Sequence, residues 1–197
     1  GAANTLYDVT YQDTGVLTVN RRAVTLTADA ASKVYDGGVV SVPVSVSLAN
    51  GTTIASFDTL TDVTGTVTRE AGENVGLYDI VIGTGANAGA KADNYDITFE
   101  ADNDAFEIQK ARLTATGSMV YDGTTQFAGA DLTIVGVNSE TFAATGHGIM
   151  SSKHVKTNEA LVDVAGLTLS ANGAALLSNY ELLAPTDTSV SVTELAI

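Results

Sequence analysis

The chain has 197 residues, 45% hydrophobic and 16% charged, a composition typical of globular rather than disordered proteins. Its 9 basic and 23 acidic residues give a surface that repels phosphate backbones and anionic headgroups, which argues against nucleic-acid binding. No apolar run approaches the roughly 18 residues of a membrane span, which argues against direct membrane insertion. The absence of cysteine excludes disulfides and thiolate metal sites.

Short segments in which β-branched residues alternate with others follow one another along the chain, which predicts strands with one buried face. In the first half they cover residues 16–19, 23–28, 40–48, 63–67, 78–82, 95–99 and 105–108. In the second half they cover residues 113–116, 132–135, 161–169, 180–183 and 189–192. Glycine, asparagine and aspartate turns separate them, and long helical periodicity is absent.

This pattern predicts an all-β fold of tandem antiparallel β-sandwich modules, similar to immunoglobulin domains, in an elongated array. A β-grasp-like module is the alternative. Its candidate short helices would be residues 85–94 and 171–179.

Two tyrosine-centred phrases recur at almost the same distance. Val-Tyr-Asp-Gly at residues 34–37 returns 86 residues later, and Asn-Tyr-Asp-Ile at residues 94–97 returns as Asn-Tyr-Glu-Leu after 85. Two landmarks with one period indicate an array in which each unit is a folding module. The residues concerned are Tyr35, Asp36, Gly37, Asn94, Tyr95, Tyr121, Asp122, Gly123, Asn179 and Tyr180.

The repeat also predicts the domain boundaries. Residues 6–11 mirror residues 94–99, so residues 1–21 are predicted to be the terminal hairpin of a preceding repeat or the leading strands of the first module. Modules are then expected at 22–109 and 110–197. Residues 106–113 contain no proline, serine or glycine, so we expect a short, stiff joint.

The recurring phrases favour a structural role. A tyrosine at a strand end can bury its ring while its hydroxyl holds a neighbouring loop, and Asp-Gly forms a turn. Asn-Tyr follows a turn of small residues and opens a strand, where asparagine tolerates a left-handed backbone. A phrase that occurs once per module more often specifies the fold than a ligand site.

These phrases resemble the MBG and YDG repeat domains of large bacterial surface adhesins, many of them similar to filamentous haemagglutinin and exported by two-partner secretion. Residues 22–109 resemble the MBG type, and residues 110–197 the YDG type. The MBG-like phrases lie at residues 74–82, 94–99 and 106–111. The YDG-like phrases lie at residues 120–125, 166–170 and 179–180.

The resemblance implies a non-catalytic stalk or tip segment of a cell-surface or secreted adhesin, acting in attachment and biofilm cohesion, with adjacent repeats of the same chain as neighbours. An alternative is that the modules themselves bind a polysaccharide, a host glycan or a surface protein, although the chain has no tryptophan for a sugar platform. A third possibility is an accessory segment that tethers a catalytic neighbour.

No cofactor is expected, and calcium is the one weak candidate. Acidic residues cluster near the end of the first module, and their oxygens are ligands that calcium accepts. The candidates are Asp93, Asp96, Asp102 and Asp104. A solvated hairpin turn explains the same residues, because the pattern of an EF-hand loop is missing.

Two further sets of residues could carry chemistry. His147 and His154 are the only histidines, and they lack the partners of a catalytic triad or a zinc site. Lys33, Lys91 and Lys110 could form an isopeptide crosslink only if buried beside an Asn or Asp, whereas lysine is seldom buried unpaired. We therefore predict no enzymatic activity.

Overall fold

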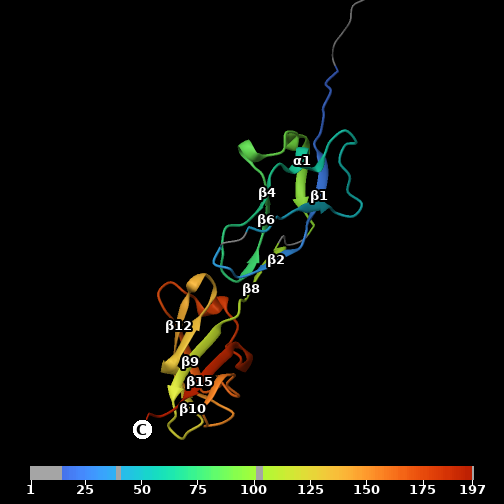
Figure 1. Cartoon of the computed structure of the whole chain (residues 1–197). Helices are drawn as coiled ribbons and strands as arrows, with labels where there is room; N and C mark the ends of the chain where they lie inside the picture. The colour runs from blue at the N-terminus through green and yellow to red at the C-terminus, as the bar shows by residue number, and fades with distance from the viewer. Residues whose placement is uncertain (1–14, 39–40, 101–103, 197) are drawn as a thin grey trace, which may run out of the picture.

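The computed structural model describes residues 15–38, 41–100 and 104–196. Within them, short strands form two bundles that follow one another along the chain and meet where β8 leads into β9 (Figure 1). The prediction of an all-β fold is confirmed. We call β1–β8 the first module and β9–β15 the second module.

In its described residues, the first module contains eight short strands, one short helix and two 3-10 turns. These are β1 (Arg22–Ala28), β2 (Ala31–Val34), β3 (Val46–Leu48), α1 (Leu60–Thr64), β4 (Val67–Arg69), β5 (Gly76–Tyr78), β6 (Ile80–Ile82), η1 (Gly85–Asn87), η2 (Ala92–Asn94), β7 (Tyr95–Phe99) and β8 (Phe106–Gln109). They form three small sheets, in the orders β3-β1-β7, β2-β8-β5 and β4-β6.

The second module is built on one larger sheet, in the order β10-β12-β11-β9-β15-β13, with β14 also pairing to β12. Its elements are β9 (Thr114–Val120), β10 (Gln126–Ala128), η3 (Gly129–Asp131), β11 (Leu132–Val135), η4 (Val137–Ser139), β12 (Thr141–Ile149), β13 (Lys156–Glu159), β14 (Leu167–Ala171), η5 (Leu177–Asn179), η6 (Pro185–Asp187) and β15 (Thr188–Thr193).

The pairing is mixed, which differs from the antiparallel sandwich expected from the sequence. β1 runs parallel to β7, β2 runs parallel to β8, and β9 runs parallel to β15, whereas the other pairs are antiparallel. A period of two shows which face of a strand is buried, but it carries no information on the direction of the partner strand. In both modules the entering strand therefore lies beside a strand from the end of the same module.

Several predicted strands differ from the observed ones. Residues 16–19 form no strand, and their side chains are exposed. The segment 78–82 is divided at Asp79, because β5 pairs with β8 and β6 pairs with β4. Only the end of 161–169 is a strand, and 180–183 makes a single bridge from Tyr180 to Ala111.

Helix α1 replaces part of the strand predicted at residues 63–67. Thr59 caps it: its hydroxyl accepts from the Asp62 N–H, and the Asp62 carboxylate accepts from the Thr59 N–H. This reciprocal capping box satisfies two donors of the first turn, and it outweighs the β-branched residues that suggested a strand. The helix candidates of the β-grasp alternative contain only the 3-10 turns η1, η2 and η5.

The core is continuous across the joint. Phe106 and Ile108 of β8, Ala111 and Leu113 of the connecting segment, and Tyr180 of the second module belong to one cluster of buried side chains. A shared core of this kind restrains the relative movement of the two modules.

Candidate functional site: the junction between the modules

The junction brings together two of the repeated phrases, one from each module. Tyr35 follows β2, and its N–H donates to the Gln109 carbonyl at 2.8 Å, at the end of β8. Asn179 ends η5 and Tyr180 follows it, and the Asn179 carbonyl accepts from the Ala111 N–H at 3.0 Å. The strand pairing of each module thus places one of the repeated tyrosine phrases at the joint.

Glu140 bridges the two modules. One carboxylate oxygen accepts from the Tyr35 hydroxyl at 2.6 Å, and the other accepts from the Tyr180 hydroxyl at 2.8 Å. The Tyr180 hydroxyl also accepts from the Val137 N–H at 3.0 Å. Tyr35 is 7% exposed and Tyr180 is 2% exposed. Hydrogen bonds to a carboxylate with so little solvent nearby are stronger than those between neutral groups.

The aromatic rings at the junction pack edge to face. The centroid of Tyr180 lies 5.5 Å from that of Tyr35 and 5.0 Å from that of Phe142, with interplanar angles of 80° and 75°. Each such pair contributes about 0.5–1.5 kcal/mol beyond the buried area. Tyr180 is therefore the centre of both the polar and the apolar contacts.

Asn179 adds a third connection. Its side-chain oxygen accepts from the Val75 N–H at 2.9 Å, and its amide nitrogen donates to the Asn74 side-chain oxygen at 3.0 Å. Both partners belong to the turn before β5. Asn179 is 1% exposed, so its amide is fully engaged between the modules. Few other side chains supply a donor and an acceptor side by side.

The Asp-Gly turn after Tyr35 also faces the second module. The Asp36 carboxylate accepts from the Gly38 N–H at 2.9 Å, and Gly37 has φ +71°. A Cβ atom on Gly37 would lie 3.2 Å from the Cβ of Asn138. A side chain at Gly37 would therefore be unfavourable both for the backbone and for the contact with the second module.

Lys33 supports this turn from within the first module. Its ammonium group lies 3.0 Å from the Asp36 carboxylate and 2.7 Å from that of Glu73. Burial opposes the charge of Lys33, but these hydrogen bonds outweigh it and raise the pKa of Lys33 above its ordinary value. Lys33 thus remains charged and ion-paired, which is unfavourable for the neutral amine that an isopeptide crosslink requires.

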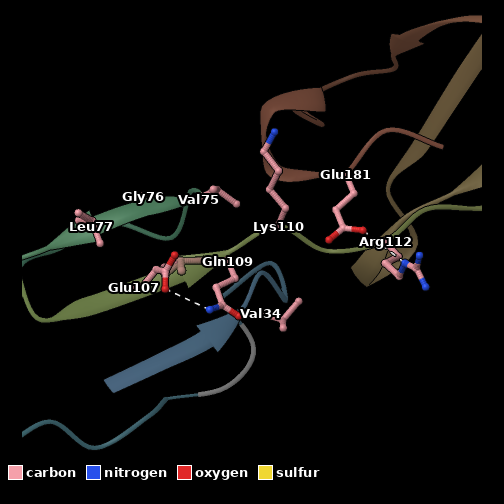
Figure 2. A pocket seen from close by; sticks show the side chains of 10 residues that line it. Val34, Val75, Gly76, Leu77, Glu107, Gln109, Lys110, Arg112 and Glu181 are labelled. Carbon is pink, nitrogen blue, oxygen red and sulfur yellow. Dashed lines mark hydrogen bonds and ion pairs between the residues drawn. The ribbon is translucent and has the colours of Figure 1, made fainter. Parts of the chain in front are cut away.

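A crevice of about 770 Å³ runs beside the connecting segment (Figure 2). On the side of the first module it is lined by Val34, Leu77 and Glu107, and on the side of the second module by Arg112 and Glu181. Arg112 lies 3.4 Å from Glu181 and is exposed, so this ion pair adds little stability. The crevice is open, and the described residues that line it include no convergent set of catalytic groups.

The other copies of the phrases lie at the outer ends of the two modules. Tyr121 is half-buried, and its N–H donates to the Thr193 carbonyl at 2.9 Å, as that of Tyr35 does to Gln109. The Asp122 carboxylate accepts from the Thr124 N–H, and Gly123 has φ +84°.

At the opposite end, the Tyr95 hydroxyl repeats the hydrogen bonds of the Tyr180 hydroxyl. Its hydroxyl donates to Asp58 at 2.6 Å and accepts from the Ala55 N–H at 3.0 Å, whereas Asn94 is exposed. The two phrases of a module thus occupy its two ends.

The remaining candidates do not form a site. Among the residues that the structure describes, no group of three or more His, Asp or Glu side chains could hold a metal ion. Asp102 lies outside the described residues, and Asp93 and Asp96 flank the start of β7. His147 lies on β12 and His154 on the loop before β13.

The other two lysines considered for a crosslink lie at separate places. Lys91 pairs with Asp58, and Lys110 lies in the connecting segment, where it lines the crevice. None of the helices in the described part of the chain has the length and apolarity needed to cross a membrane.

The junction should weaken at high pH. Burial and the hydrogen bonds to Glu140 raise the pKa of Tyr35 and of Tyr180 above 10.0, the ordinary value. A pKa raised by folding means that the stabilisation is complete below pH 10 and is lost as the pH rises through the folded values. Absorbance titration of tyrosinate should show a late phase, and Tyr35→Phe and Tyr180→Phe should each reduce its amplitude. A late phase that both variants leave unchanged would contradict this.

Comparison with protein-family models agrees with the geometry. Residues 24–105 match the MBG domain of the YGX type, and residues 109–189 match the YDG domain. No curated protein and no solved structure matches the chain. Both families are non-enzymatic and of the repeat type, and they are typical of repeat segments in large surface proteins. The chain therefore contains one MBG domain followed by one YDG domain.

Proposed function

We propose that this chain is a non-catalytic spacer segment of a bacterial surface or secreted adhesin, in which the locked junction keeps neighbouring modules in a fixed orientation. Such a segment projects a distal binding region away from its anchor and contributes to attachment and biofilm cohesion. Export by two-partner secretion fits the families concerned. The proposed neighbours are adjacent repeats of the same chain.

The observation that carries this proposal is the Glu140 bridge. A carboxylate that is shared by two buried tyrosines from different modules restrains the movement of one module relative to the other. Leaving one of these groups without its partner costs about 1–3 kcal/mol, so bending at the joint is opposed by several such contacts together. Stiffness at this joint is what a spacer requires.

A second candidate function is the binding of a polysaccharide, a host glycan or a surface protein by the modules themselves. The crevice beside the connecting segment favours this candidate, because a chain could lie along it between Leu77 and Arg112. None of the described residues that line it is a tyrosine or tryptophan, so these residues offer no stacking on a sugar ring. We rank this function below the spacer.

The stiffness can be measured directly, because the chain has no cysteine. Spin labels on Thr68→Cys and Thr168→Cys, at exposed strand positions on either side of the joint, should give a narrow distance distribution in pulsed electron double resonance. Glu140→Ala should broaden it, because two buried hydroxyls lose their acceptor. Glu107→Ala removes an exposed carboxylate near the joint and is the matched control. A broad distance distribution in the chain with Glu140 intact would contradict the spacer proposal.

The role in attachment needs a cellular test. A lectin of known specificity would be displayed on bacteria beyond this segment, beyond its Glu140→Ala variant, or beyond a Gly/Ser linker of equal length. We expect the intact segment to support attachment to a glycan-coated surface best. Binding of the isolated segment to a glycan array would instead favour the second candidate.

A further inference from the structure

The outer end of the first module repeats the receiving half of the junction. In the second module the Glu140 N–H donates to the Val137 carbonyl at 3.0 Å, which forms a turn beside the Tyr180 hydroxyl. In the first module the Asp58 N–H donates to the Ala55 carbonyl at 3.0 Å, beside the Tyr95 hydroxyl. The same three groups, a carboxylate, a tyrosine hydroxyl and a backbone N–H, therefore meet in both modules.

We propose that this end of the first module, around Asp58, Asn94 and Tyr95, is a docking surface for the Tyr-Asp-Gly end of a further module of the same kind joined ahead of Arg22. The inference rests on the proposed spacer function and extends it: the observed junction is one instance of a contact that each module can make at both ends.

The surface carries the same kinds of groups as the observed junction. A hollow of about 480 Å³ lies beside Asn94 and Tyr95. Phe57 is 80% exposed at its edge, and the Asn94 side chain is exposed, whereas its counterpart Asn179 is almost fully covered by the neighbouring module. An exposed phenylalanine next to an exposed amide matches the apolar and polar contacts that the junction uses.

Lys91 takes the place that Tyr35 has in the observed junction. Its ammonium lies 2.5 Å from the Asp58 oxygen that does not bind Tyr95, just as the Tyr35 hydroxyl donates to the Glu140 oxygen that does not bind Tyr180. It also lies 5.6 Å from the centre of the Phe57 ring. An incoming tyrosine hydroxyl would bind Asp58 together with this long, partly exposed side chain or displace it. Without such a tyrosine, Lys91 balances the charge of the Asp58 carboxylate.

The complementary end is present in the second module. Tyr121 occupies the same strand end as Tyr35, and its hollow is lined by Val155 and Leu195, with Glu194 beside them. Asp122 and Glu194 make this end acidic, whereas the docking surface carries both signs, with Arg21, Arg22 and Lys91 close to Asp58 and Asp93. The three cations of the docking surface can pair with the carboxylates of the incoming end, and such pairs select orientation.

The register of such a joint can be read from the structure. The Gln109 carbonyl accepts from the Tyr35 N–H, and the Thr193 carbonyl accepts from the equivalent Tyr121 N–H. Ala111 pairs with Tyr180, and Arg22 pairs with the equivalent Tyr95. One residue separates Gln109 from Ala111. Joining Thr193 of one copy directly to Arg21 of a second copy therefore reproduces the observed spacing.

The test is a tandem chain in which residues 1–193 are followed by residues 21–197. Spin labels at Thr168→Cys of the first copy and Thr68→Cys of the second copy span the new joint, and the same two positions within one copy span the observed joint. We expect a narrow distance distribution across both joints.

The matched control uses one substitution at two places. Tyr121→Ala in the first copy should broaden the distribution across the new joint, whereas Tyr121→Ala in the second copy, where no module follows, should leave it narrow. Asn94→Ala should show the reverse dependence: it should broaden the distribution across the new joint when placed in the second copy and leave it narrow when placed in the first copy.

The outcomes separate the two proposals. A broad distribution across the new joint with a narrow one across the observed joint would overturn the docking surface and leave the spacer function standing, whereas broad distributions across both would overturn both. Equal broadening by Tyr121→Ala from either copy would assign its effect to the fold of the module and overturn the docking role.

Discussion

Replacing Tyr180 by alanine is expected to lower the free energy of unfolding of the second module by about 4 kcal/mol, the size found when a buried aromatic ring is removed. The ring is 2% exposed and packs against Phe142 and Tyr35, and its hydroxyl serves both Glu140 and Val137. Urea unfolding followed by circular dichroism measures this change.

Two variants make the result specific. Tyr180→Phe keeps the ring and loses only the hydrogen bonds, so about 1–3 kcal/mol is expected. Tyr121→Ala removes the same side chain from the half-buried, open end of the same module, and a smaller loss is expected there. Equal losses of unfolding free energy for Tyr180→Ala and Tyr121→Ala would show that the junction contacts of Tyr180 add no stability.

The tyrosine phrases could be predicted from the sequence because they combine a fixed period with residues of restricted use. Tyr35, Asn179 and Tyr180 were expected to be structural, and they lie at the junction. The contact between the Tyr35 phrase and the Tyr180 phrase could not be predicted. The period shows that both phrases recur, but it does not show at which end of a module each one lies. That placement depends on the parallel pairing of β2 with β8, which alternation does not reveal.

Glu140 was missed for a related reason. The segment 137–140 reads Val-Asn-Ser-Glu and its counterpart 55–58 reads Ala-Ser-Phe-Asp, with no identical residue. Their separation of 82 residues also differs from the period of the tyrosines. What the two segments share is a turn, a carboxylate and a backbone donor, and these contacts are visible only in the structure.

Helix α1 could have been found from Thr59 and Asp62, whose spacing is that of a capping box. The sequence does not reveal how closely this helix is packed. The Gly83 N–H donates to the Thr64 carbonyl at 3.1 Å, and the Thr66 N–H donates to the Asn87 carbonyl at 3.0 Å. The backbone after the helix thus lies directly against the loop that contains η1, which only residues without a side chain permit.

Gly65→Ala should therefore strongly destabilise the first module, with an expected loss of about 3 kcal/mol from a left-handed backbone and overpacking together. Gly65 has φ +66°, and an added Cβ would overlap the Asn87 carbonyl oxygen. Thermal and urea unfolding measure the loss.

Gly51→Ala is the matched control for Gly65→Ala, because Gly51 has φ +81° with open space around it, so that only the backbone cost of about 1–2 kcal/mol is expected. A similar loss for both variants would show that close packing at Gly65 is unimportant. A larger loss at Gly65 would show that the loop holds α1 in place, and with it Asp58, which directly precedes the helix cap and forms the centre of the proposed docking surface.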